Sequence, residues 1–406
     1  MYQLLIRLLS PLVIVLIAVD AIKRQGGWRF FGQRLGFNYS NISSSKKVIW
    51  IHCASVGEVT AAEPLIEKLL QQPQQYEVVV STNTPTGYQL LLQSFQNQIQ
   101  HFYCPFDWPY AINNFLQAVK ANELWVMETE IWPNLYQLCH QQQIKIKILN
   151  ARLSKKTLNT PQWLQNSYRQ SLGVVDQILS RSQTETERFI QLGALSSRIL
   201  TIGNIKYAKL KQLTSSNSPV KRDYVLAAST HNGEELAIAQ NWLKLKRNEL
   251  LIIVPRHPKR MPAIRKQLKT LKVKFAIASL KQSVDKDTQI YLIDQIGKLL
   301  PLYEHAKLVI MGGSFDEKGG HNILEPAAYA KAILTGPDMS DFESETSLML
   351  KAQGIVQCQN YDDLFNQITH LFQHPEQLQQ LGKNAKTLVS RENDIIDLYL
   401  QALKLG

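Results

Sequence analysis

Residues 311–326, MGGSFDEKGGHNILEP, place two glycine pairs on either side of a short charged loop. The loop directly follows the apolar run Leu308–Met311, and a short apolar run that ends in glycine predicts a buried strand. A helical pattern opens near His321, and the apolar residues 331–335 before Gly336 predict the next strand. The stretch therefore predicts a strand, a glycine-rich turn and a helix N-terminus in succession.

Such a succession forms a phosphate site. Free backbone N–H groups point at the anion, the helix dipole favours it, and glycine lets the backbone come close. The alternative is that the glycines only form tight turns. A plain turn has no need of the polar groups of Asn322 and Glu325, which favours the phosphate site.

The alternation of apolar runs and helical patterns extends in both directions from this stretch. It covers residues 48–202 and starts again over 224–356, and the intervening residues 206–223 are polar and lack periodicity. Regular alternation predicts an α/β fold with parallel sheets and helices on both faces. Ligands of such folds bind beyond the carboxyl ends of the strands, so residues directly after each apolar run are the site candidates.

The chain of 406 residues is long enough for two domains. We expect two Rossmann-like parallel-sheet domains facing a cleft, where strand ends from both sides meet a shared ligand. The expected segments are an N-terminal membrane-anchor helix (1–24), an N-terminal domain (25–207), a linker (208–223), a C-terminal domain (224–385) and a C-terminal helix (386–406).

Composition narrows the class of partner. The net charge of +12 suits an anionic partner, but the basic residues are scattered and no nucleic-acid motif accompanies them. We therefore expect a membrane surface or a phosphorylated lipid and no nucleic acid. The cysteines lack paired spacing, which argues against a disulfide framework and a zinc site and favours a reducing compartment; they are Cys53, Cys104, Cys139 and Cys358.

Residues 4–22 are the most apolar segment, but their uninterrupted core, residues 11–19, is short for a span of roughly 20 residues. Three interpretations compete: a signal peptide cut near residue 21, a short spanning helix, and a helix lying in the plane of the membrane. The in-plane anchor fits best, because basic residues together with Trp28 and Phe31 follow at head-group level.

Acidic and basic residues follow the strands of the first half. Glu58 is the last residue of HCASVGE (52–58). It is either a capping charge at the N-terminus of the following helix or a general base, and the spacing of the motif favours neither. Glu128 and Glu130 come after a buried strand, where excluded water would leave them in need of a partner or a role; the alternative is a capping residue beside a solvated one. Arg152 and Lys206 follow later strands. Each is expected either to bind a phosphate or carboxylate of a ligand or to form an ordinary surface ion pair.

Small and basic residues follow the strands of the second half. ASTHNGEE (228–235) is a small-residue turn into a helix and a second anion-receiving shape, with Ser229 and His231 as its candidates. PRHP (255–258) presents Arg256 and His257 together on a rigid turn, which suits a phosphate, although His257 alone would more often be structural.

Taken together, these motifs resemble those of the 3-deoxy-D-manno-octulosonic acid (Kdo) transferases of lipopolysaccharide synthesis, which are glycosyltransferases of the GT-B fold. The resemblance runs in the family's order over nearly the whole chain. Cys53, where another small residue is usual, is a modest departure. The matching stretches are WIHCASVGE (50–58), PFD (105–107), ETEIWPN (128–134), NARLS (150–154), GNIK (203–206), ASTH (228–231), PRHP (255–258), Gly312–Gly313, GGHN (319–322) to Glu325–Pro326, and Gly336–Pro337.

The resemblance implies an inverting transfer of Kdo from CMP-Kdo to a sugar hydroxyl of a lipid A precursor (lipid IVA). The first domain would bind the acceptor and the second the CMP-sugar. Glu58 would be the base, Glu128 and Lys206 would support the transition state, and Glu130 is the alternative to Glu128. CMP would bind through Ser229, His231, Pro255, Arg256, His257, Met311, Gly312, Gly313, Gly320, Asn322, Ile323, Leu324, Glu325, Gly336, Pro337, Asp338 and Met339.

The resemblance also implies that no metal and no cofactor take part, because protein groups would neutralise the phosphate. The only Asp-x-Asp, Asp285 to Asp287, lies in a polar loop rather than at a strand end. The expected location is the cytoplasmic face of the inner membrane of a Gram-negative bacterium. The alternatives are another GT-B enzyme that uses a UDP-sugar, and a non-catalytic, membrane-bound nucleotide-binding protein.

Overall fold

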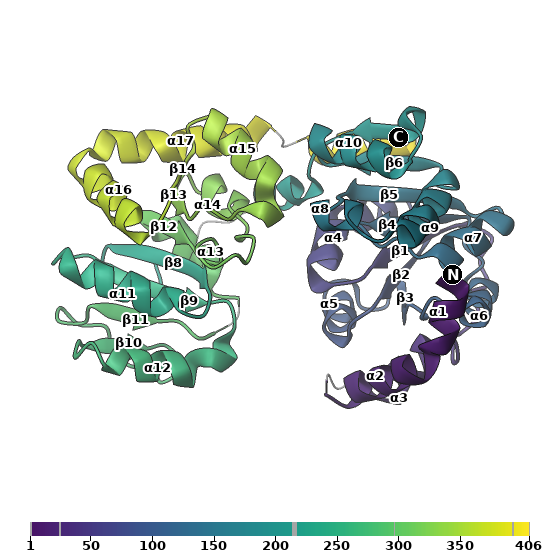
Figure 1. The fold of residues 1–406 in the computed structure, drawn as a ribbon, viewed down its shortest axis with the longest axis horizontal. Helices are drawn as coiled ribbons and strands as arrows, with labels where there is room; N and C mark the ends of the chain where they lie inside the picture. Colours follow the sequence, from purple (N-terminus) through teal and green to yellow (C-terminus); the bar gives the residue numbers. More distant parts are fainter. Residues whose placement is uncertain (1, 24–25, 213–216, 296, 392–393, 406) are drawn as a thin grey trace. The chain divides into compact units, whose positions relative to one another are not determined.

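The computed structural model describes residues 2–23, 26–212, 217–295, 297–391 and 394–405. Its contacts divide the chain into two compact units (Figure 1). Unit 1 comprises residues 1–209 together with 394–406, and unit 2 comprises residues 210–393. The C-terminal residues therefore return to the unit in which the chain began.

The core of unit 1 is a seven-stranded, all-parallel sheet in the order β3-β2-β1-β4-β5-β6-β7. Residues of both parities in β1, such as Ile49 and Trp50, are fully buried, so both faces of this strand are covered. The strands are β1 (Lys47–Cys53), β2 (Tyr76–Thr82), β3 (Gln100–Tyr103), β4 (Glu123–Met127), β5 (Lys145–Ala151), β6 (Gln177–Ser180) and β7 (Ile199–Thr201).

Helices join these strands and supply the covering layers of unit 1. Several begin at a side-chain cap or with proline in their first turn; for example, Thr84 Oγ1 accepts a hydrogen bond from the N–H of Gly87 in α5. The helices are α3 (Gly27–Arg34), α4 (Val56–Leu70), α5 (Pro85–Phe95), α6 (Pro109–Val119), α7 (Pro133–Gln141), α8 (Lys155–Leu158), α9 (Gln162–Gly173), α10 (Gln183–Leu192), η1 (Ser196–Arg198), η2 (Ile205–Gln212) and α18 (Ile395–Leu403).

The N-terminal apolar segment forms α1 (Tyr2–Leu8) and α2 (Ser10–Lys23), which meet at an angle of 59°. Taken singly, none of the helices described is long and apolar enough to cross a membrane, although this bent pair passes that test when taken together. One face of the pair packs against Tyr103 and Trp108. The opposite face exposes large apolar side chains, namely Leu4, Leu5, Leu8, Leu9, Leu12, Ile14, Val15, Leu16, Val19 and Ile22.

Unit 2 also contains a seven-stranded parallel sheet, in the order β10-β11-β9-β8-β12-β13-β14. Its strands are β8 (Tyr224–Thr230), β9 (Leu250–Pro255), β10 (Phe275–Ile277), β11 (Ile290–Leu292), β12 (Leu308–Met311), β13 (Ala332–Thr335) and β14 (Ile355–Gln357). Its helices are α11 (Glu234–Lys244), η3 (Pro258–Arg260), α12 (Met261–Lys269), α13 (Leu299–His305), α14 (Leu324–Ala328), η4 (Ser340–Phe342), α15 (Glu343–Lys351), α16 (Tyr361–Gln373) and α17 (Pro375–Arg391).

The predicted α/β fold with two parallel sheets is confirmed, and the structure differs from the predicted elements in three places. The helix expected near His321 begins only at Leu324 and has five residues, and the Asn322 side chain accepts from the Leu324 N–H in the turn before it. Part of the expected linker forms the 3-10 helix η2, and residues 213–216 lie outside the described residues. The C-terminal helical pattern is divided into α17 and α18.

Candidate active site

Both sheets place their candidate residues at a topological switch point. In unit 1 the chain builds β2 and β3 on one side of β1 and then adds β4 on the other side. In unit 2 it builds β9, β10 and β11 on one side of β8 and then adds β12 on the other. Ligands of open α/β sheets bind at the carboxyl ends of the strands that flank such a point. Glu58 follows β1, Glu128 follows β4, His231 follows β8 and Gly312 follows β12.

Glu58 lies in the first turn of α4 and takes part in its cap. Ser55 Oγ accepts from the Glu58 N–H at 3.4 Å, while Glu58 Oε2 accepts from the Ala54 N–H at 2.7 Å. Burial, followed by the charge of Glu128, raises the pKa of Glu58 to about 8. The residue is therefore part of the helix cap, and its carboxyl group has a raised pKa.

Glu128 forms an ion pair with Lys206, whose Nζ lies 2.8 Å from Glu128 Oε1. Burial opposes the ionisation of Glu128, but the charges of Lys206, Arg181 and Arg152 outweigh it and lower its pKa. A strand end and a loop that are 78 positions apart in sequence are thereby joined. The carboxylate of Glu128 stays ionised and is the fixed negative charge that acts on Glu58.

Glu130 has a different environment from Glu128. Its Oε2 accepts from Trp132 Nε1 at 2.8 Å and from Asn83 Nδ2 at 3.5 Å. Asn83 in turn accepts from Arg34, whose NH1 lies 2.7 Å from its Oδ1. Burial raises the pKa of Glu130 despite the Trp132 hydrogen bond and the Arg34 charge. Glu130 is thus held by an indole and an amide rather than by a direct cation, which assigns the paired role to Glu128.

Three strand ends at these sites have left-handed backbone. Glu128, Asn150 and Ser229 have φ angles of 58°, 53° and 56°. Such angles are uncommon for residues other than glycine, and they gather where a surrounding structure holds a side chain in a particular direction. Asn150 and Ser229 lie where the register of β5 and of β8 shifts, as in a β-bulge, and Glu128 directly follows β4.

In unit 2, the buried carboxylate of Glu234 occupies part of the glycine-rich turn. Its Oε2 accepts from the N–H groups of His231 and Gly313, both at 2.8 Å, and its Oε1 accepts from the Phe315 N–H at 3.3 Å. The expectation that these N–H groups are free to receive a phosphate is therefore wrong for Gly313, because a carboxylate of the protein already binds it. Glu234 instead ties the turn after β8 to the turn after β12.

The two turns meet so closely that glycine is required. A Cβ atom on Gly312 would lie 2.6 Å from the Cα of Thr230 and 2.7 Å from the Ser229 carbonyl oxygen. Gly320 has a φ of 70°, and a Cβ there would lie 2.2 Å from Met339 Sδ. The glycines of the motif thus allow three loops, after β8, β12 and β13, to contact one another.

Imidazole groups line the same region. His231 Nε2 and His321 Nε2 lie 2.9 Å apart, so one donates and the other accepts, and the ring of His257 lies 5.6 Å from that of His231. Burial, followed by the charge of Arg256, lowers the pKa of His321 to about 4. Burial likewise lowers the pKa of His231. The pair is therefore neutral near pH 7 and able to donate or accept hydrogen bonds.

Glu325 and Asn322 form the polar edge of this cluster. Asn322 Nδ2 donates to Glu325 Oε1 at 3.0 Å. Burial raises the pKa of Glu325, opposed by the Asn322 hydrogen bond and by the charge of Arg256. Asp338 accepts from the Gly319 N–H at 2.7 Å, which holds the loop after β13 against the glycine pair.

The other predicted residues of unit 2 divide into two groups. Arg256, His257 and Pro337 are exposed and accessible to a ligand. Six others are buried, so they support the turns and do not expose side chains to a ligand: Pro255, Met311, Gly336, Ile323, Leu324 and Met339. The predicted site is thus a cluster of loops in which a few polar side chains surround a buried apolar support.

Sequence reasoning missed three residues that organise these sites. Glu234 was quoted in a motif but given no role, although acids at the first turn of a helix after a small-residue loop are a recognisable signal. Arg260, which binds Glu235 at 2.9 Å, gave no such signal. Asp107, which accepts from the N–H groups of Asn134 and Leu135, lies far from α7 in sequence.

Across the described ranges, no group of three or more His, Cys, Asp or Glu side chains is arranged to hold a metal ion. The four cysteines are free and buried.

Comparison with known proteins agrees with these motifs. Residues 29–209 match the family described as 3-Deoxy-D-manno-octulosonic-acid transferase (kdotransferase). The chain is 30% identical to the 3-deoxy-D-manno-octulosonic acid transferase of Haemophilus influenzae over 416 residues, 99% of this chain and 97% of that protein. It is 29% identical to the enzyme of the same name from Rickettsia felis over 375 residues, 89% of this chain and 80% of that protein.

A solved structure of another protein has a similar fold. The UDP-GlcNAc 2-epimerase of Neisseria meningitidis matches with a TM-score of 0.62 at 13% identity, covering 87% of this chain and 100% of that one. This likeness concerns the GT-B-like fold alone, whereas the sequence identity to the transferases extends over nearly the full length. The chain therefore belongs to the family of 3-deoxy-D-manno-octulosonic acid (Kdo) transferases, which are glycosyltransferases.

Proposed function

We propose that the protein transfers Kdo with inversion from CMP-Kdo to a sugar hydroxyl of a lipid A precursor, lipid IVA, with Glu58 as general base and without a metal ion. The names of its relatives support Kdo as the transferred sugar. The observation that carries the base is the position of Glu58 at the switch point of unit 1, where burial and Glu128 raise its pKa to about 8.

In the proposed reaction, the acceptor hydroxyl oxygen attacks the anomeric carbon of Kdo while Glu58 takes the hydroxyl proton. The bond between that carbon and the phosphate oxygen breaks, and CMP leaves with the bonding electrons. A carboxyl group with a pKa near the working pH is an effective acceptor of this proton. The ammonium group of Lys206, fixed on Glu128 at 2.8 Å, would stabilise negative charge that develops beside Glu58.

The donor would bind in unit 2 through its CMP group. Arg256 and His257 are exposed on the turn after β9, and the neutral pair His231 and His321 offers hydrogen bonds beside them. Arg256 supplies the positive charge for the phosphate, and the carboxyl of Glu325 would accept from ribose hydroxyls. Because Glu234 already binds the Gly313 N–H, side chains rather than that N–H would receive the phosphate.

The N-terminal helices would hold the enzyme at the cytoplasmic face of the inner membrane. Leu8 and Ile22 expose 71% and 79% of their surface, while Ile6 and Ile17 pack into unit 1. A helix pair held to the protein on one face and apolar on the other suits an anchor in the membrane plane. The net charge of +12 favours an anionic membrane and a phosphorylated lipid acceptor.

The test uses Glu58→Gln, which keeps an oxygen to accept from the Ala54 N–H, beside Glu67→Gln as the matched control on the exposed side of α4. Full-length protein is incubated with CMP-Kdo, lipid IVA and EDTA, and mass spectrometry follows the lipid. We expect the unaltered protein and Glu67→Gln to add Kdo, and Glu58→Gln to be slower by about 1,000-fold while binding CMP within twofold.

Three outcomes would contradict parts of the proposal. Equal rates for Glu58→Gln and the control would remove Glu58 as the base. Transfer that needs a divalent metal would overturn the metal-free mechanism. Binding of UDP in preference to CMP would replace the donor by a UDP-sugar.

A further inference from the structure

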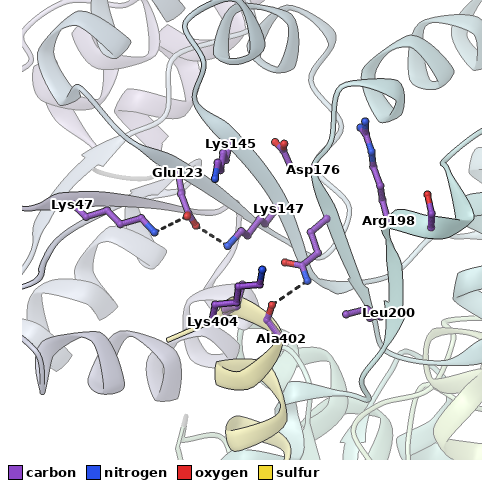
Figure 2. A pocket seen from close by; sticks show the side chains of 12 residues that line it. Lys47, Glu123, Lys145, Lys147, Asp176, Arg198, Leu200, Ala402 and Lys404 are labelled. Carbon is purple, nitrogen blue, oxygen red and sulfur yellow. Dashed lines mark hydrogen bonds and ion pairs between the residues drawn. The ribbon is translucent and has the colours of Figure 1, made fainter. Parts of the chain in front are cut away.

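A cavity of about 440 Å³ lies at the amino edge of the sheet of unit 1, away from the strand ends that carry Glu58 and Glu128 (Figure 2). The starts of β1, β4, β5 and β6 line it together with β7, and the last turn of α18 closes it. Its volume is that of a small-molecule site. The proposed transfer reaction makes no use of this cavity.

The sheet register directs a row of polar side chains to one face here. Glu123 pairs with Lys145 across β4 and β5, and Trp125 pairs with Lys147. Because side chains alternate along a strand, Lys145 and Lys147 lie on the same face as Glu123 and Trp125. Gln177, which pairs with Lys147, extends the row on β6 and donates to the Ala402 carbonyl of α18 at 3.1 Å.

The floor of the cavity is a buried ionic cluster. Glu123, whose side chain is only 5% exposed, binds Lys47 Nζ at 2.7 Å and Lys147 Nζ at 2.9 Å. Trp125 Nε1 donates to the same carboxylate at 2.9 Å. Burial opposes the ionisation of Glu123, but these hydrogen bonds outweigh it and lower its pKa. One carboxylate therefore holds two ammonium groups, and the cluster keeps a net positive charge.

Further positive charges surround this floor. Lys145 and Lys404 are exposed, and Figure 2 shows their amino groups directed toward that of Lys147. Arg198 also lines the cavity, but its guanidinium donates to the Val175 carbonyl at 2.6 Å, and Figure 2 shows it directed away from the three lysine amino groups, which are the charges that converge. Of the lining residues, five are cationic, but only Glu123 and Asp176 are acidic. Like charges that converge in this way repel one another unless an anion binds between them.

We propose that this cavity binds a soluble anion that carries at least two phosphate-type charges. The basic side chains come from β1, β5, η1 and the residue after α18, so the site exists only in the folded unit and with the C-terminal residues in place. Lysine side chains act as point charges toward phosphate oxygens, and Gln177 and Ser197 add polar groups for the ligand.

The position of the cavity favours a soluble ligand over a membrane lipid. The buried face of α1 and α2 packs on the cluster around Tyr103 and Trp108, beyond the carboxyl end of β3. The cavity lies at the opposite edge of the sheet and on the side of β6 and β7. In Figure 1, α1 and α2 lie toward the side of the sheet that ends in β3, whereas β6 lies toward its other side. A head group in a membrane touched by α2 is therefore remote from this site.

The test measures binding of inorganic pyrophosphate to the full-length protein by calorimetry and maps it by acetylation of lysines followed by mass spectrometry. The double variant Lys145→Gln with Lys404→Gln removes two exposed cations without touching the Glu123 cluster. The control is Lys386→Gln, an exposed lysine on α17 of unit 2. We expect pyrophosphate to protect Lys145 and Lys404, but not Lys386, from acetylation.

The variants give the quantitative outcome. Affinity for pyrophosphate should fall at least tenfold in the double variant and stay within twofold in the control, and it should weaken with added salt. Transfer activity without pyrophosphate should be unchanged, because both lysines lie away from the proposed catalytic edge. Unchanged affinity in the double variant, or equal acetylation with and without pyrophosphate, would overturn the proposal. A double variant that binds phosphatidylglycerol vesicles less well but pyrophosphate as well as the unaltered protein would also overturn the proposal, and would indicate a lipid as the ligand.

Discussion

Lys206 Nζ lies 2.8 Å from Glu128 Oε1, and this pair joins the start of η2 to the end of β4. The side chains are 26% and 16% exposed, so the pair is largely withdrawn from water. The charge of Glu128 in turn raises the pKa of Glu58. The three residues therefore behave as one electrostatic unit, and a change in one should be detectable at the others.

Lys206→Ala should lower kcat about 100-fold, because a positioned charge at the reacting centre is lost. It should also lower the free energy of unfolding by about 1–3 kcal/mol, since Glu128 is left without its cation. Steady-state kinetics and urea unfolding measure the two effects. Lys46→Ala, before β1, is the control. Adding Glu128→Gln to Lys206→Ala should restore at least half of the lost stability, and a further loss would disprove the coupling.

The pH profile of kcat/KM should rise through a pKa of about 8, the value to which burial and Glu128 raise Glu58. The base acts only when deprotonated, so activity increases as pH rises. In Glu128→Gln the rising limb should move to lower pH, because the neighbouring negative charge is gone. An unmoved limb would mean that another group titrates.

The same pKa affects stability in the opposite direction. The folded protein binds the Glu58 proton more tightly than the unfolded chain, whose carboxyl has the ordinary value near 4.5. Between these values the folded state holds more protons, so its stability decreases as pH rises. Glu58→Gln should flatten the stability profile between pH 5 and pH 8, as measured by urea unfolding.

Gly312→Ala should destabilise unit 2 by about 1–3 kcal/mol and weaken CMP binding, because its Cβ would lie 2.6 Å from the Thr230 Cα. The obstructing atoms are backbone and cannot turn aside. Gly173→Ala, at the end of α9, is the matched control, because nothing lies within 4 Å of its added Cβ. Thermal unfolding and CMP titration give the result. Equal behaviour of the two variants would show that the turns after β8 and β12 are not in close contact.

Tyr399→Phe should weaken activity through a position remote from the reacting atoms. The Tyr399 hydroxyl accepts from the Asn150 N–H at 3.2 Å and donates to the Gly203 carbonyl at 3.0 Å, and Gly203 precedes the loop that carries Lys206. We expect a loss of about 1–3 kcal/mol in unfolding free energy and a fall in kcat with little change in KM. The exposed Tyr110→Phe serves as control. An unaltered kcat with lowered stability would limit Tyr399 to a structural role.

The strands and the strand-end residues were predictable, because a parallel strand buried on both faces is a continuous apolar run followed by a turn. Leu308–Met311 has the bounds that the pattern predicted. The role of Glu234 was not predictable, because nothing in a sequence shows that its carboxylate will bind the N–H of Gly313, 79 positions away. Helix α14 begins later than the glycines suggested, because residues 321–323 form a turn in which Asn322 accepts from the Leu324 N–H. The ion pair of Lys206 depends on a sheet order that periodicity does not specify.

The return of α18 to unit 1 has a consequence for how the protein is made. Ile395, Tyr399 and Leu403 are buried there, although they follow all of unit 2 in the sequence. Domains generally fold as they leave the ribosome, N-terminal first. Here the N-terminal sheet stays without part of its cover until the whole C-terminal sheet has been synthesised. Nascent chains that stop short of residue 394 should therefore depend on chaperones.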